Sequence, residues 1–223
     1  MSVVASMARK ELLELRYNKG VLMSIAAFTI VFCVISPSGS SDLSMILLST
    51  MMGMYAAFGI SGQAFNSEKQ SGSLETTFCG PVELRELWLG KIIGTLVPAL
   101  VVAYAAVGIV LAEAFVRSTP IVIGLTVAVY LIAILPALVA AFIGIMGFIQ
   151  LNFGARQTRL LSTAALALII SLLTASLSLP QEGNLISWQA IAIIGLAAVL
   201  LLTSPALLVN RLSKERIVLT SEA

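Results

Sequence analysis

The sequence contains no histidine, and few of its residues are charged. Histidine is the commonest general base and the commonest transition-metal ligand, so its absence excludes histidine-dependent catalysis and metal binding. Charged residues make up 11% of the chain, whereas a soluble domain carries about 25%. The net charge of +2 is small, and the basic residues lie in short separate segments. We therefore expect no nucleic-acid partner.

Nucleotide-binding and catalytic motifs are also missing. The sequence has no Gly-x-x-x-x-Gly-Lys-Ser/Thr, so this chain cannot itself hold nucleotide phosphates in a P-loop. Its apolar segments contain scattered serines and threonines but no base to activate them, which argues against an intramembrane enzyme. The two cysteines, Cys33 and Cys79, fall in an apolar run and a polar loop, and we interpret both as free thiols.

What the sequence does contain is long apolar runs. Hydrophobic residues make up 59% of the chain, and a run of about 20 crosses a hydrocarbon core of roughly 30 Å. We expect an all-α polytopic membrane protein, a single domain over residues 1–223. In the fourth of its spans, Pro136, Gly144 and Gly147 are expected to bend or break the helix. The six predicted spans are 21–35, 43–65, 92–112, 120–151, 160–179 and 186–209.

The basic residues give the orientation. With the N-terminus inside, twelve of the thirteen lysines and arginines fall on the cytoplasmic side, and only Arg117 falls outside. This distribution predicts a multi-pass protein of the cell (inner) membrane with both termini in the cytoplasm. The first run could instead be read as a cleaved signal peptide, but the segment before it is long and contains Glu11 and Glu14.

Residues 1–19 are expected to form an amphipathic interface helix. Apolar residues recur there at helical spacing, and Arg9 and Lys10 point away from them, as in a helix lying on a lipid membrane. Glu11 falls near the apolar stripe, which suits a protein neighbour better than lipid. The residues that define this predicted surface are Met7, Arg9, Lys10 and Glu11.

Residues 66–91 form the largest polar segment, a cytoplasmic loop between the second and third predicted spans. Ser67 and Gln70 have the spacing of a capping box, which predicts that a short helix begins there. Gly80-Pro81 fits the end of that helix and the start of the next. Gly90-x-x-x-Gly94 then allows close helix approach, and a contact between two copies of the chain is one candidate use.

This loop resembles the cytoplasmic segment of ABC-2 type permeases, the membrane subunits of ATP-binding-cassette exporters. The resemblance rests on Glu68-Lys69-x-x-Gly72-x-Leu74-Glu75, then Pro81, then Leu87-x-x-Gly90-Lys91, with six predicted spans and an amphipathic start in the same order. It implies a coupling helix that docks on a separate ATPase. The residues that it assigns to ATPase coupling are Glu68, Gly72, Leu74, Glu75 and Pro81, to which we add Phe78, Val82 and Leu84 as apolar contacts.

The resemblance also implies the partners. These are two ATPase subunits, which would bind the ATP and Mg²⁺, and a second copy of this chain or a related permease. This chain would then be a non-catalytic subunit with no cofactor of its own. The family's broken helix before the outer end of the last span is reduced or absent here, because residues 177–188 are short and polar.

Other readings of the chain stay open. One is an ATP-independent carrier or channel, although the predicted spans lack interior charged residues. A structural partner of another membrane complex is a second. Within the permease class, a haem-export type of similar length with a Gly-Ser-Leu-Glu in the same loop is a minor alternative. The sequence names no substrate.

Overall fold

Every element of the structure is helical. The computed structural model describes residues 3–35, 42–70, 84–116, 118, 124–153, 155–177 and 188–209. The all-α prediction is confirmed for these residues. The helices are α1 (Val3–Tyr17), α2 (Lys19–Ile35), α3 (Asp42–Gln70), α5 (Leu84–Val116), α6 (Leu125–Val129), the π-helical turn η1 (Tyr130–Ile134), α7 (Leu135–Asn152), α8 (Ala155–Leu177) and α9 (Trp188–Val209).

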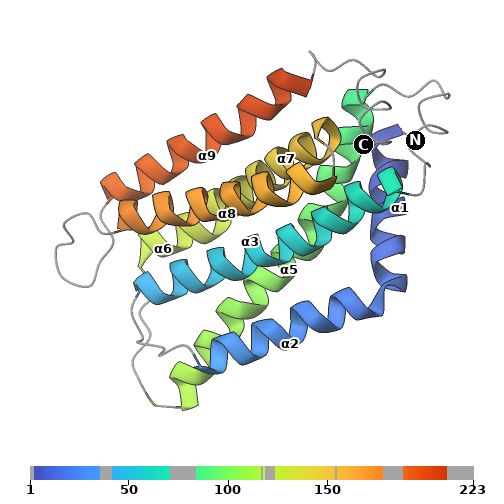
Figure 1. Cartoon of the computed structure of the whole chain (residues 1–223). Helices are drawn as coiled ribbons and strands as arrows, with labels where there is room; N and C mark the ends of the chain where they lie inside the picture. Colours follow the sequence, from blue (N-terminus) through green and yellow to red (C-terminus); the bar gives the residue numbers. More distant parts are fainter. Residues whose placement is uncertain are drawn as a thin grey trace.

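The long helices lie side by side and alternate in direction, with α6, η1 and α7 forming one continuous rod (Figure 1). Helices α2, α5 and α8 begin at one end of this bundle, and α3, α7 and α9 finish there. We call it the basic end, because the described helices carry their lysines and arginines there or on α1. Helix α1 lies across this end beside the start of α5 (Figure 1).

Within the described ranges, four helices are long and apolar enough to cross a membrane, which indicates a multi-pass membrane protein. The structure therefore shows four long candidate spans rather than the six predicted, and they correspond to the second, third, fourth and sixth of the prediction. The first and fifth correspond to shorter apolar helices, described over Lys19–Cys33 and Leu160–Ser171. The four long candidate spans are Met45–Phe65, Leu84–Val116, Leu125–Asn152 and Trp188–Pro205.

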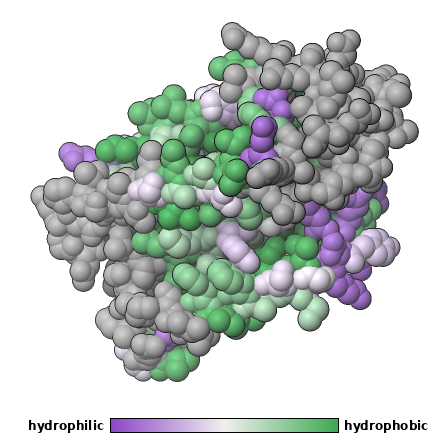
Figure 2. Space-filling model, viewed as in Figure 1, coloured by the Kyte–Doolittle hydropathy of each residue, from purple (hydrophilic) through white to green (hydrophobic). Residues whose placement is uncertain are grey.

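Helix α7 forms the centre of the bundle and packs against α3, α5 and α9. Its inward side chains, among them Phe142, Ile143 and Met146, are buried. On α9, by contrast, Leu196 is 64% exposed. Apolar side chains cover much of the visible side of the bundle, and hydrophilic ones gather where α1 lies (Figure 2). Apolar outward faces are what a hydrocarbon solvent requires of a helical bundle.

One predicted helix boundary is wrong. Ser67 does not begin a helix, because α3 continues through it to Gln70. The second predicted helix is expected to lead into the third span, and α5 does run from Leu84 through Gly90 and Lys91 without a break. The predicted boundary at Gly80-Pro81 lies outside the described residues. The polar ends of α3 and α5 therefore extend the apolar spans.

The predicted interruption of the fourth span takes the form of a π turn. Residues 130–134 adopt it just before Pro136, and the helix then continues regularly through Gly144 and Gly147. These glycines serve packing. A Cβ atom at Gly144 would lie 3.2 Å from the Trp88 ring, and one at Gly147 would lie 2.6 Å from the Phe65 ring. Both positions stay small because aromatic rings of α5 and α3 fill the space beside them.

Candidate functional site

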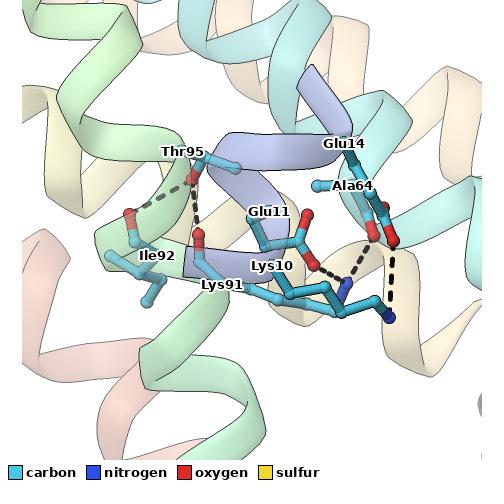
Figure 3. Close-up of polar contacts among 7 residues, drawn as sticks. All are labelled: Lys10, Glu11, Glu14, Ala64, Lys91, Ile92 and Thr95. Atoms are coloured by element: carbon cyan, nitrogen blue, oxygen red, sulfur yellow. Dashed lines mark hydrogen bonds and ion pairs between the residues drawn. The ribbon is translucent and has the colours of Figure 1, made fainter. Parts of the chain in front are cut away.

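A buried lysine joins three helices at the basic end of the bundle. Lys91, on α5, has a side chain that is 1% exposed. Its Nζ atom donates to Oε1 of Glu11 on α1 at 2.6 Å and to the carbonyl oxygen of Ala64 on α3 at 2.6 Å. Figure 3 shows the ammonium group between these two acceptors. We call Glu11, Ala64 and Lys91 the lysine junction.

The junction pairs two opposite charges that are both almost completely buried. The Glu11 side chain is 5% exposed, and Nζ of Lys91 also lies 5.3 Å from the centroid of the Phe65 ring, within reach of a cation–π attraction. Removing one member of a buried ion pair leaves an uncompensated charge, at a cost of about 3–5 kcal/mol. Each of the two charges therefore depends on the contact between the helices for its partner.

Two glycines let α1 approach α5 closely enough for this contact. A Cβ atom at Gly90 would lie 2.7 Å from Cβ of Met7, and one at Gly94 would lie 2.7 Å from Cβ of Glu11 and 3.0 Å from the Ala8 carbonyl. Real Cβ atoms do not come so near. The suggestion that Gly90-x-x-x-Gly94 joins two copies of the chain is corrected, because α1 of the same chain covers both glycines.

A small cavity of about 40 Å³ lies between α1, α3 and α5 beside the junction. It is large enough for a water molecule. Thr95 borders it but donates its hydroxyl hydrogen within its own helix, to the carbonyl oxygens of Lys91 at 2.8 Å or Ile92 at 3.1 Å. The residues that line the cavity are Glu11, Glu14, Leu15, Ile60, Gln63, Ala64, Gly94 and Thr95.

The charged side chains on the outward side of α1 are exposed, in contrast to the buried Glu11. Lys10 and Glu14 form an ion pair at 3.5 Å with side chains that are 45% and 50% exposed, and such surface pairs contribute about 0–1 kcal/mol. Arg9 is also exposed, whereas Met7 is half-buried against α5. The predicted protein neighbour of Glu11 is thus Lys91, and the predicted contact of Arg9 and Lys10 with a membrane surface stays a prediction.

Most of the predicted ATPase-coupling residues fall outside the described part of the chain. Of the eight, Glu68 lies in the last turns of α3. Leu84 begins α5 and is 8% exposed in the main core, which leaves little of its side chain for a second protein. The six that the described ranges do not include are Gly72, Leu74, Glu75, Phe78, Pro81 and Val82.

Sequence reasoning missed the lysine junction as a site, although a signal was present. Lys91 begins an otherwise apolar run, and Glu11 lies in the apolar stripe of α1. Two opposite charges in apolar settings are each costly to bury alone and become tolerable as a pair. Nothing in the sequence indicated the Ala64 carbonyl, because only the crossing of α3 and α5 brings it to Lys91.

Comparison with known proteins gives no further identification. No protein-family model matches this chain, and neither a curated protein nor a solved structure matches it. Within the described ranges, no group of three or more histidine, cysteine, aspartate or glutamate side chains is placed to hold a metal ion.

Proposed function

We propose that this chain is the membrane permease subunit of an ABC transporter of the exporter type, driven by a separate P-loop ATPase. The motif resemblance between residues 68 and 91 gives the class, and the bundle of long apolar helices agrees with it. Two copies of the chain, or one copy and a related permease, would enclose the pathway between them. Alternating access would then move the substrate across the membrane.

The proposal includes six crossings, and the chain path supports the two shorter ones. Helices α7 and α9 both end at the basic end, so the chain must return to the other end between them, along α8 (Figure 1). Helix α2 likewise carries the chain away from the basic end before α3 returns. Its 17 residues span about 25 Å at 1.5 Å per residue. Six crossings would put both termini on the same side of the membrane as the basic end, and the basic residues favour the cytoplasm as that side.

The observation that carries the proposal is the lysine junction. Ala64 lies near the end of α3 and Lys91 near the start of α5, so the junction ties together the two helices between which residues 71–83 lie in the sequence. Glu11 adds α1 to the same unit. A force applied to the 71–83 segment by an ATPase would therefore move α1, α3 and α5 together rather than bend a loose loop.

The mechanism follows from this linkage. ATP binding would close the two ATPase subunits and draw the two 71–83 segments toward each other. The linked helices would carry that motion into the spans and turn the bundles from inward-open to outward-open, because packed helices shift as rigid bodies. Hydrolysis would reset them.

The test is a pull-down of the tagged chain in mild detergent from its native host, with mass spectrometry of the captured proteins and an ATPase assay of the eluate. A stoichiometric P-loop ATPase, lost in Glu75→Arg and kept in Glu113→Arg, would support the permease and its docking segment. Glu113 is the matched control because it lies at the far end of α5. If wild type captures no ATPase while the protein stays intact, the permease proposal fails and ATP-independent flux is tested instead.

A further inference from the structure

The rod formed by α6, η1 and α7 changes its hydrogen-bond register within one turn. The N–H of Leu135 donates to the carbonyl of Tyr130, five residues earlier. Pro136 comes next and has no N–H, so the carbonyls of Leu131 and Ile132 lose the donors that a π or an α register would give them. The π turn is therefore where the rod's own backbone hydrogen bonds are weakest.

A tyrosine from another helix supplies one of the missing donors. The hydroxyl of Tyr104, on α5, donates to the carbonyl oxygen of Leu131 at 2.9 Å. Tyr104 is 42% exposed, on the outward side of its helix. An unpaired backbone carbonyl is costly in a hydrocarbon environment, so this single bond fixes the π turn to α5.

A second tyrosine holds the same turn to α3. The hydroxyl of Tyr130 lies 2.5 Å from Oγ1 of Thr50, with Tyr130 fully buried. Thr50 Oγ1 also lies 2.6 Å from the Ile46 carbonyl oxygen, which can only accept. Because Thr50 has one hydroxyl hydrogen and gives it to Ile46, Tyr130 is the donor to Thr50.

The two ends of the rod are held very differently. Helix α7 packs along α3, α5 and α9, whereas η1 is the only described element against which α6 packs extensively. Within α6, Val127 is fully buried in the main core, while Leu125 is 71% exposed. A change at the π turn would therefore move α6 more readily than α7, and Val127 is the buried side chain that α6 has to withdraw from the core.

We propose that η1 is a hinge about which α6 swings, and that the hydroxyls of Tyr104 and Tyr130 latch it in the closed position. Helix α6 lies at the end of the bundle opposite the basic end (Figure 1). If the chain is a permease, as proposed, α6 would act there as an outer gate of the substrate pathway. The hinge itself does not depend on that function. Opening requires the loss of the two tyrosine hydrogen bonds and the withdrawal of Val127 from the core, but no unwinding of α7.

The test is amide hydrogen exchange of the full chain in lipid nanodiscs, read by mass spectrometry. In Tyr104→Phe, amides of residues 125–134 should exchange about two- to tenfold faster than in wild type. The exchange rates of residues 139–151 should not change. Tyr55→Phe is the control, because it removes a hydroxyl from a tyrosine of α3 that stacks on Phe28 of α2. Equal exchange of 125–134 in Tyr104→Phe and in the control would overturn the latch.

A second variant tests the hinge independently of the tyrosines. Pro136→Ala restores an N–H that can bond to the Ile132 carbonyl, so the turn should adopt the α register and exchange more slowly than in wild type. Exchange that is unchanged or faster there would overturn the hinge. Neither measurement needs an ATPase. Failure to capture an ATPase would therefore refute the permease proposal without affecting the hinge proposal.

Discussion

The Nζ atom of Lys91 lies 2.6 Å from Oε1 of Glu11, although the two residues are 80 positions apart in the chain. The contact is not on the surface, since the two side chains are 1% and 5% exposed. Each charge is therefore tolerable only because of the other. This dependence makes the pair suitable for a double-mutant test.

We expect Lys91→Met and Glu11→Met each to destabilise the protein by about 3–5 kcal/mol, because each leaves its partner buried without a counter-charge. The double variant Lys91→Met/Glu11→Met should be much less destabilised than the sum of the two single losses. Thermal unfolding in detergent measures all three. Lys10→Met, at the exposed pair with Glu14, is the control and should change stability by less than about 1 kcal/mol. Additive single losses would show that the two charges do not interact.

Because α1 packs closely on α5, we expect two glycines of α5 to differ in how much their replacement by alanine destabilises the protein. Gly94→Ala places a Cβ atom 2.7 Å from Cβ of Glu11 and should destabilise by about 1–3 kcal/mol, because α1 has to move away. Gly108→Ala has no atom within 4 Å of its new Cβ and should be neutral or stabilising by up to about 1 kcal/mol. Melting temperatures of the two variants make the comparison. Similar values would mean that α1 does not pack on α5 in this way.

The sequence predicts the class of fold well, because runs of about 20 apolar residues leave few alternatives to membrane helices. It also places Glu11 against a protein neighbour, since a carboxylate in an apolar stripe needs a partner. It does not predict that α3 continues to Gln70, because the capping-box signal at Ser67 competes with a helix already under way. Pro136 does predict an interruption of the fourth span, but not that it takes the form of a π turn. The π turn depends on side chains of α3 and α5, here Thr50 and Tyr104.

The candidate site is less predictable than the fold for a physical reason. The lysine junction is formed by residues 11, 64 and 91, and although Glu11 and Lys91 each stand in an apolar setting, nothing in their own segments indicates that they meet. A backbone carbonyl such as that of Ala64 carries no sequence signal at all. Only the crossing of three helices makes these atoms a site.

If the junction transmits force, breaking it should separate ATPase binding from ATPase control. We expect Lys91→Met, reconstituted with the captured ATPase in proteoliposomes, to keep the ATPase bound. The factor by which this chain stimulates ATP hydrolysis should fall about tenfold. The reason is that residues 71–83 would remain available while α1 was no longer tied to α3 and α5. Hydrolysis rates and co-sedimentation of the ATPase are measured on the same sample. Normal stimulation in Lys91→Met, with Lys10→Met as the reference, would remove the junction from the transmission path.

The proposed six crossings predict the sides of the membrane on which particular residues lie. In a background with Cys33→Ala and Cys79→Ser, single cysteines are introduced as Ser6→Cys, Ser118→Cys and Ser213→Cys. A membrane-impermeant maleimide added to intact cells should label the cysteine at position 118, and those at 6 and 213 only after permeabilisation, because we expect the basic segments to lie in the cytoplasm. Label at position 6 in intact cells would mean that α2 does not cross. Label at position 213 in intact cells would show that the return along α8 does not traverse the bilayer, and the chain would then have an odd number of spans.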